Sequence, residues 1–371
     1  APGIPFYSVP ASGRYVDARH FYFTSTMPAV QVMTQSSGAV DKEDPTIAGG
    51  SRSWFYGYQE AMYNRLGRGF QGFRGSGKSQ LLPDTRGVRV TTLFHQKFPL
   101  TGRVETEETA PLNKPTFPIR RETNTWRCGL NNRAACPALP PIPQNTVYTP
   151  FLDRQVAQSY DLAASQANSS ALVGTVTTLN ASSSGAAASG WDAWGNLRNQ
   201  LVTTSDGATG GAFVSNQVVG TTNSYTIDAT AWWVNKLDTS TVTTSIAYAS
   251  GHALPAGAGA PARTVSKSFA WNSNRTPQSQ TVQPGVPNQQ VTTSYGYPTP
   301  SYGLPTSVTA TASGASPTSR LTGLSYSNNG TSVATDGYFV LQTTNAAGHV
   351  TTTETRPRDG QVSRVIAPTG L

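Results

Sequence analysis

Residues 72–79 read GFRGSGKS, which satisfies the G-x-x-x-x-G-K-[ST] pattern of the phosphate-binding loop in nucleotide hydrolases. That loop needs a buried strand before it and a helix that begins at the Lys-Ser pair, so that backbone N–H groups converge on the phosphates. Asn64 and Arg65 lie where the buried strand would be apolar. Pro83 and the turn sequence PDTRG would end the helix at once. The sequence therefore predicts no nucleotide site and places Lys78 in a turn.

Other chemistry-bearing residues also lack the spacing that a site needs. The acidic run at 41–44 (DKED) has neither the Gly nor the distal Glu of a calcium loop. Cys128 and Cys136 flank GLNNRAA, and two cysteines without a nearby histidine make no four-ligand zinc site. We expect them to form a local disulfide, with two free thiols as the alternative. None of the four histidines accompanies a nucleophile motif: His20, His95, His252 and His349. We expect no enzyme activity, metal or cofactor.

The composition indicates a β-rich exported protein. Among 371 residues, charged residues make up 12%, about half the usual share, while there are 35 Gly and 26 Pro. Such a composition also fits disorder, but 7 Trp, 15 Tyr and 13 Phe provide side chains that disordered segments lack. We expect folded β structure in a protein that is secreted or on the bacterial cell surface.

The net charge of +8 is confined to one part of the chain. Residues 1–150 hold 17 Lys and Arg against 10 Asp and Glu, whereas 151–371 are nearly balanced. The arginines are scattered, and no nucleic-acid-binding module surrounds them, so we expect no nucleic-acid partner. No run approaches the ~20 apolar residues of a membrane span. The chain begins at Ala1 without a methionine, which is typical of a fragment or a processed product.

Alternating patterns predict the strands. Trp54, Tyr56 and Tyr58 fall on one side of a strand, and Val88, Val90 and Phe94 share a face of another. The segment 54–98 is therefore predicted to be an antiparallel meander with GSGKS as a glycine-rich connection. Residues 126–150 are rich in proline and are expected to be a connector. Beyond them, Thr-rich strands alternate with Gly, Asn and Pro turns, which predicts a degenerate repeat of about twenty to thirty residues.

Both parts resemble one family. The stretch from 56 to 102 resembles the segment before the repeats in B-type subunits of bacterial insecticidal toxin complexes, in a Tyr-rich strand, a GRGF element and an FP-x-x-G element. The matching residues are Tyr56, Tyr58, Gly67, Arg68, Gly69, Phe70, Gly72, Phe73, Phe98, Pro99 and Gly102. The sequence WDAWGNL at 191–197 resembles the YDxxGNL form of Rhs/YD repeats, with Trp191 in place of Tyr, followed by Asp192 and Gly195.

The resemblance implies an all-β fold in which the meander leads into a curved, spiralling YD-repeat sheet, part of a hollow shell. It implies three regions: a pre-repeat region (1–125), the connector with its two cysteines (126–150) and truncated repeats (151–371). Glycines at 67, 69 and 72 are expected to bend the chain while Phe70 and Phe73 pin the turn into the core. Trp191, Trp271, Tyr295 and Tyr326 are expected to stack between successive turns, and the sheet edge at Leu371 is expected to continue.

The implied function is structural: the shell encloses a toxic C-terminal polypeptide and helps to deliver it. The implied partners are the rest of the shell and that polypeptide. The alternative is a secreted or surface binding module, an adhesin or carbohydrate-binding protein, in which Trp232 or Trp233 would stack on sugars. Because adjacent strand residues face opposite sides, one of these two tryptophans is expected to be in the core.

Overall fold

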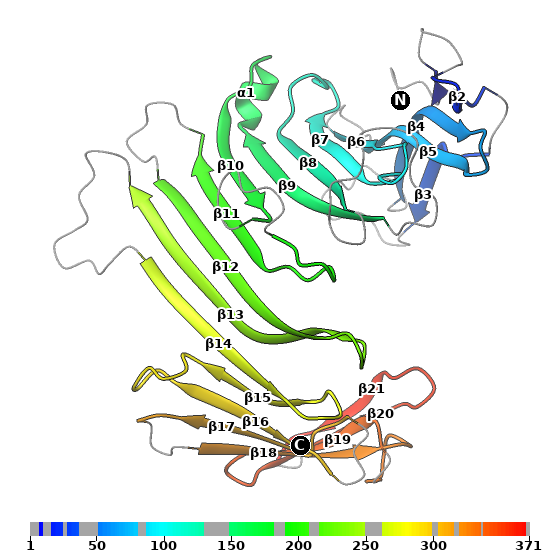
Figure 1. Cartoon of the computed structure of the whole chain (residues 1–371). Helices are drawn as coiled ribbons and strands as arrows, with labels where there is room; N and C mark the ends of the chain where they lie inside the picture. Colours follow the sequence, from blue (N-terminus) through cyan, green and yellow to red (C-terminus); the bar gives the residue numbers. More distant parts are fainter. Residues whose placement is uncertain are drawn as a thin grey trace. The chain divides into compact units, whose positions relative to one another are not determined.

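The fold is nearly all β. The computed structural model describes residues 7–9, 16–24, 28–36, 51–80, 87–129, 148–181, 190–207, 215–248, 262–298, 303–314, 319–334 and 337–368. Within these ranges lie 21 strands and one short helix, and all the strands belong to one sheet (Figure 1). The predicted all-β class is confirmed.

The first of two compact units comprises residues 1–220 and 244–263. It opens with β1 (Tyr7–Ser8), β2 (His20–Tyr22), β3 (Val32–Ser36), β4 (Ser51–Asn64), β5 (Gly69–Gln80) and β6 (Val88–Phe94). Strand β4 pairs with β1 in parallel and with β2 and β3 antiparallel. Strand β5 then pairs antiparallel with β4 and β6. The predicted meander between 54 and 98 is confirmed.

The unit continues with β7 (Val104–Pro111), β8 (Arg120–Gly129), β9 (Thr149–Tyr160), helix α1 (Leu162–Gln166), β10 (Leu172–Leu179) and β11 (Asn199–Asp206). Each strand from β6 to β11 pairs antiparallel with the next. Residues 130–147 of the predicted connector lie outside the described residues. The strands on either side of them, β8 and β9, pair along their length, from Arg120↔Ser159 to Gly129↔Thr149.

The second unit comprises residues 221–243 and 264–371. Strands β12 (Ser215–Asp228), β13 (Trp233–Tyr248) and β14 (Ala262–Trp271) contribute residues to both units. The second unit then adds β15 (Pro277–Val282), β16 (Val291–Gly296), β17 (Ser307–Ala312), β18 (Ser319–Ser327), β19 (Phe339–Thr344), β20 (Val350–Thr355) and β21 (Val362–Ile366). From β14 to β21, every strand pairs antiparallel with its successor.

The GSGKS segment is not the connection that the sequence predicts. Residues 75–79 lie inside β5, where Gly77 pairs with Gly57 of β4 and Thr91 of β6. Glycine is a poor strand former, but here two neighbouring strands supply a ladder partner on each edge. The Gln59 side chain also lies directly over Gly75, where a Cβ would collide with its amide. Packing between strands therefore overrides the local turn signal.

The sheet has almost no apolar core. The largest side chains under 2% exposed in the described residues are three serines, Ser79, Ser165 and Ser327. The buried apolar residues are few and spread along the chain: Ala61, Met62, Ala110, Phe151, Ala181, Tyr326 and Leu341. In a two-layer domain, one face of each sheet would be buried against the other. Most strand residues here are instead half-exposed on both faces.

Hydroxyl pairs across neighbouring strands account for the Thr-rich composition. Ser224 Oγ and Thr239 Oγ1 are 2.6 Å apart, and Thr281 and Thr292 join β15 to β16 at 3.1 Å. Further hydroxyl pairs are Thr34–Ser53, Thr241–Ser266 and Thr243–Thr264. Such pairs each add a few tenths of a kcal/mol to about 1 kcal/mol. They stabilise a sheet that has little apolar surface to bury.

Candidate functional site

The GRGF element forms the tight turn between β4 and β5. Gly67 (φ 92°) and Gly69 (φ 67°) take left-handed backbone conformations that other residues adopt only with strain. Asn64 accepts the Leu66 N–H at 2.8 Å, and Gln71 donates to the Arg68 carbonyl at 3.1 Å. The predicted bending role of the glycines is confirmed, and amide side chains hold the turn from both ends.

A buried glutamine fixes an irregularity beside this turn. The register of β4 and β5 shifts between Ala61 and Tyr63, next to Glu60 at φ 55° and Gly72 at φ 85°. Gln96 is 5% exposed, and its amide donates to the Glu60 carbonyl at 2.5 Å and the Gly72 carbonyl at 2.9 Å. Both carbonyls are thereby satisfied where the ladder is interrupted.

Two phenylalanines were predicted to pin the turn into the core, and one of them does so. Phe73 is half-buried, and its ring centroid lies 4.6 Å from that of Tyr58 and 6.4 Å from that of Tyr7. Phe70 contacts Phe73 edge-on at 5.7 Å but is 48% exposed. The prediction for Phe70 is therefore wrong, because no layer covers this face of the hairpin.

The structure brings the two elements of the resemblance together. Residues 95–103, which contain the FP-x-x-G element, form a tight loop closed by the bonds His95 N to Arg103 O and Gly102 N to His95 O, both 2.8 Å. The guanidinium carbon of Arg68 lies 3.5 Å from the centre of the Phe98 ring, in cation–π geometry. Arg68, which was identified from the sequence only as a residue of the GRGF motif, thus links the turn to this loop.

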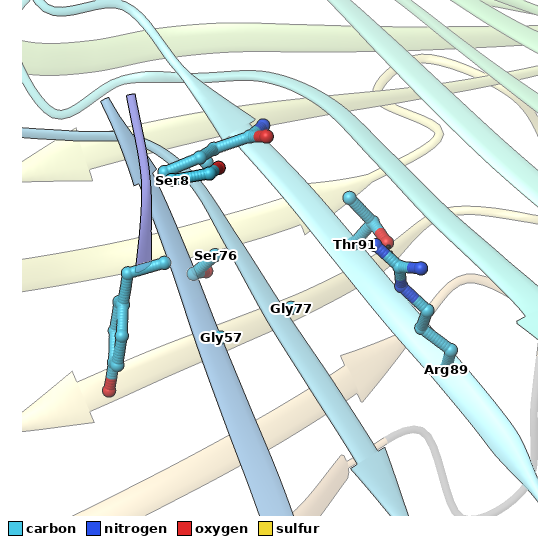
Figure 2. Close-up of a pocket in the computed structure, with 9 residues that line it drawn as sticks. Ser8, Gly57, Ser76, Gly77, Arg89 and Thr91 are labelled. Carbon is cyan, nitrogen blue, oxygen red and sulfur yellow. Dashed lines mark hydrogen bonds between the residues drawn. The ribbon is translucent and has the colours of Figure 1, made fainter. Parts of the chain in front are cut away.

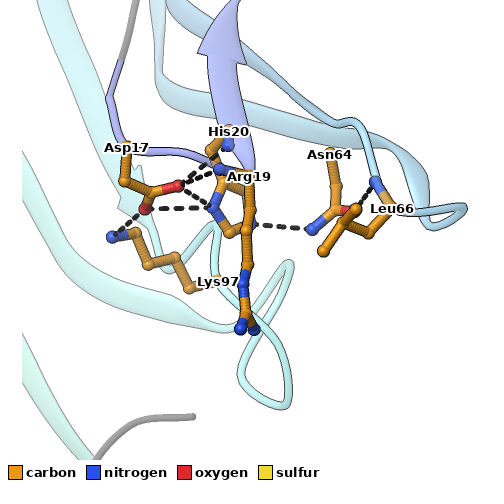
Figure 3. Close-up of polar contacts among 6 residues, drawn as sticks. All are labelled: Asp17, Arg19, His20, Asn64, Leu66 and Lys97. Carbon is orange, nitrogen blue, oxygen red and sulfur yellow. Dashed lines mark hydrogen bonds and ion pairs between the residues drawn. The ribbon is translucent and has the colours of Figure 1, made fainter. Parts of the chain in front are cut away.

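A polar network that the sequence does not predict lies beside the same turn (Figure 3). His20 Nδ1 lies 2.9 Å from Asp17 Oδ1, and Lys97 Nζ lies 3.1 Å from Asp17 Oδ2. On its other side, His20 Nε2 lies 2.9 Å from Asn64 Nδ2. Because the Asn64 oxygen already accepts from Leu66, its NH₂ group faces the histidine. His20 thus lies between the Asp17 carboxylate on its Nδ1 side and the Asn64 amide on its Nε2 side.

The network sets the charge of Asp17. Burial works against its ionised form, but hydrogen bonds from the Arg19 N–H, His20 and Lys97 outweigh that effect and hold its pKa well below the usual range. Both ring nitrogens of His20 are occupied by these contacts. The arrangement is a structural clasp between β2, β4 and the 95–103 loop, and it leaves no ring nitrogen for proton transfer.

A small groove on β4, β5 and β6 is where a phosphate loop would have to act (Figure 2). Its floor includes Gly57 and Gly77, and Arg89 lies along one side with Nε donating to Thr91 Oγ1 at 3.0 Å. The volume is about 60 Å³, enough for a few water molecules and far below a nucleotide pocket. Lys78 is exposed in β5, and its Nζ lies 5.4 Å from the Trp54 ring. The extended backbone here offers no phosphate cradle.

The WDAWGNL segment forms a five-residue loop. Asp192 N donates to Asn196 O at 2.9 Å, and Asp192 Oδ1 accepts from the N–H groups of Trp194 (2.8 Å) and Asn196 (3.0 Å). Gly195 has φ 88°, which explains the glycine of the motif. Trp191 pairs with Leu197 in an isolated bridge. Each motif residue therefore has a defined place in the loop.

Two further loops share this geometry without matching the motif. At 272–276, Asn272 N donates to Thr276 O at 2.9 Å, and Arg275 has φ 70°. At 345–349, Asn345 N donates to His349 O at 3.0 Å, and Gly348 has φ 81°. The three loops share an Asp or Asn followed three residues later by a residue with a left-handed backbone. The sequence reveals this pattern where that residue is glycine, as at Gly348.

Three of the aromatic residues predicted to stack between turns donate hydrogen bonds to backbone carbonyls. Trp191 Nε1 donates to the Leu152 carbonyl of β9 at 3.1 Å, and Trp271 Nε1 donates to the Leu237 carbonyl of β13 at 2.8 Å. Tyr326 is buried and donates to Pro305 O at 2.7 Å. Trp191 and Trp271 also make ring contacts, with Phe151 at 6.1 Å and Trp233 at 5.9 Å, and stacking between successive turns stays a prediction; Tyr295 is half-buried in β16.

The remaining predicted residues take no part in a site. Cys128 lies in β8, and Cys136 lies outside the described residues, so the disulfide stays a prediction. The acidic run at 41–44 also lies outside them. In the described ranges, no three His, Cys, Asp or Glu residues gather as a metal site would require. His95 is half-buried, 4.0 Å from Glu105. No helix among the described residues is long and apolar enough to cross a membrane.

The fold defines the class: a single-layer, all-β antiparallel sheet. No protein-family model and no curated protein matches the sequence. Three solved structures share the fold: TcdB2-TccC3-TEV (TM-score 0.57, 86% of this chain), TcdB2-TccC3 without hypervariable C-terminal region (0.55, 87%) and TcdB2-TccC3-Cdc42 (0.56, 87%). Identity is 10% in each, and this chain spans about a fifth of those chains, at 20%, 20% and 21%. The chain therefore shares its fold with the matching part of these TcdB2-TccC3 chains.

Proposed function

We propose that this chain is a segment of a β-shell that encloses a toxic C-terminal polypeptide and helps to deliver it. The observation that carries the proposal is the scarcity of large buried side chains in a long sheet: among the described residues, no side chain under 2% exposed is larger than serine. A wall that separates an interior from solvent has two exposed faces and no apolar layer between them. The half-exposed strands fit such a wall better than they fit a packed domain.

The likeness to TcdB2-TccC3 chains supports the same function. This chain covers only about a fifth of each of those chains, so the rest of the shell and the enclosed polypeptide are the proposed partners. In this proposal the sheet follows the spiral course of a shell wall, and the protein is secreted. We propose no catalytic role for this segment.

The hydroxyl-rich strands give the wall a suitable chemistry. An enclosed polypeptide must not adhere to its container, and exposed apolar patches would hold it. Where Thr and Ser side chains bond to each other across strands, as Thr241 and Ser266 do at 3.3 Å, the wall would present polar groups to a cargo chain.

Protease protection of the complete protein tests this function. We expect a C-terminal polypeptide that resists protease in the native particle and is digested after mild urea opens the shell. Electron cryomicroscopy should place residues 190–368 in a closed wall with density inside. Equal digestion before and after urea, or a particle without an interior, would refute the shell.

The exposure of Trp232 supports a carbohydrate-binding module as the second candidate. Trp232 is 69% exposed at the turn between β12 and β13, whereas Trp233 is half-buried and packs edge-on against Trp271 at 5.9 Å. One of the pair was predicted to be in the core; Trp233 is packed against another ring but is only half-buried. Retention on polysaccharide columns that is lost in Trp232→Ala and kept in Trp194→Ala would favour this candidate over the shell.

A further inference from the structure

A compact basic surface surrounds the GRGF turn in the first unit. We call it the basic tip. It consists of five exposed cations and three exposed apolar residues from the segment before β2, from β4 and β5 with the turn between them, and from the 95–103 loop: Arg19, Arg65, Arg68, Lys97, Arg103, Tyr63, Leu66 and Phe70. These residues form part of neither the groove nor the repeat loops. The proposed shell function does not account for them.

Direct contacts hold the members of the basic tip together. Arg65 N donates to Arg19 O at 2.8 Å, and the Arg68 guanidinium stacks on Phe98, the residue after Lys97. The same loop ends at Arg103, which places its guanidinium 5.2 Å from the centre of the Trp126 ring. Figure 3 shows Arg19, Leu66 and Lys97 on neighbouring segments around the His20 clasp.

The positive charge of the basic tip is largely uncompensated. Asp17 pairs with Lys97, and among the described residues the guanidinium groups of Arg19, Arg65 and Arg103 have no carboxylate partner. Like charges held close together repel one another, and this cost is recovered only when an anionic group binds. Arginine also presents its donors in a planar fork that matches carboxylates.

Exposed apolar side chains lie within this ring of cations. Leu66 is 67% exposed, Phe70 48% and Tyr63 38%. They sit on a turn that is fixed by Asn64 and Gln71, so little conformational entropy is lost when a partner covers them. A rigid apolar centre with Arg and aromatic side chains around it is the composition of a protein-binding hot spot.

We infer that the basic tip docks a protein partner that presents carboxylates around an apolar socket for Leu66. Charge complementarity favours a partner with an acidic rim. The aliphatic Leu66 side chain fits an apolar socket on a protein better than it fits a stacked nucleic-acid base. Single-stranded nucleic acid would need aromatic platforms along a groove. A lipid surface would need more apolar side chains than this turn supplies.

Photo-cross-linking in the complete native assembly tests the inference. The probe is p-benzoylphenylalanine in place of Leu66, with the same group in place of Val350 on β20 as the matched exposed control. We expect Leu66 to cross-link to a protein segment rich in Asp and Glu, and Val350 not to do so. Absence of a Leu66 cross-link, or a cross-linked segment without carboxylates, would overturn the inference.

Charge variants supply the second arm. Arg19→Glu with Arg65→Glu should lower the cross-link yield about tenfold, whereas Arg19→Lys with Arg65→Lys should retain most of it, both at unchanged melting temperature. Arg320→Glu, an exposed site on β18, is the control. Vesicles that contain phosphatidylserine and a labelled single-stranded oligonucleotide are tested in parallel. If the protein binds the vesicles or the oligonucleotide, loses that binding in the double Glu variant and shows no protein cross-link, the inference of a protein partner is wrong.

Discussion

The hairpin region of β4 to β6 and the Thr-rich strands from β14 to β21 solve the same problem differently. Neither has an apolar layer, yet the first relies on long polar side chains that reach between segments, such as Gln96 and Arg68. The second relies on hydroxyl pairs and short loops closed by Asn272 and Asn345. Because the first region depends on single long-range contacts, one substitution there should lower the stability strongly. In the second region many short loops each contribute a small part of the stability.

The largest expected effect comes from Gln96. Its amide satisfies two carbonyls at the irregular part of β4 and β5, so Gln96→Ala leaves both without a donor. We expect a loss of about 3 kcal/mol, measured by urea unfolding. Gln283→Ala is the control, because that amide bonds the Thr264 carbonyl at 2.9 Å at an exposed site. A loss as large for Gln283 as for Gln96 would remove the distinction between the regions.

The Asp192 loop should respond by an intermediate amount. Asp192→Ala removes the acceptor for two backbone N–H groups and should cost about 1–2 kcal/mol, comparable to loss of a helix cap. Asp192→Asn keeps the acceptor oxygen and should cost much less. Hydrogen exchange at the Trp194 and Asn196 amides measures the effect. Equal protection in the two variants would contradict the capping role.

Acid should weaken the clasp region through Asp17. Its pKa is lower in the folded state than the unfolded value of about 4. Its contribution is therefore complete above pH about 4 and is lost as the pH falls further through the folded-state pKa. Asp17→Asn should flatten this acid limb of the stability curve. Chemical unfolding at a series of pH values below 5 measures how the free energy of unfolding depends on pH. If that dependence is the same in Asp17→Asn as in the wild type, other groups cause the acid sensitivity.

The alternation of Trp54, Tyr56 and Tyr58 was enough to predict the meander, because strands follow local side-chain periodicity. The strand nature of GSGKS was not predictable in that way, since it depends on Gln59 and on two flanking strands. Gln96 and the contact of His20 with Asn64 were missed for the same reason, because these partners lie 24 or more residues away. The loop at 345–349 was predictable, since Asn345 and Gly348 have the spacing of Asp192 and Gly195.

The smallest expected effect is that of Lys78. Sequence reasoning assigned it to a turn, whereas it lies in β5 with its ammonium group exposed and 5.4 Å from the Trp54 ring. An exposed cation–π contact is worth about 0.5–1 kcal/mol at most, so Lys78→Ala should change stability by no more than that. Neither the wild type nor the variant should bind nucleotide, because the ladder with β4 and β6 engages the backbone that would cradle phosphate. Isothermal titration with magnesium and ATP or GTP measures this directly. Binding that disappears in Lys78→Ala would show that β5 leaves the sheet, and the hairpin region would then be the less stable partner in the comparison.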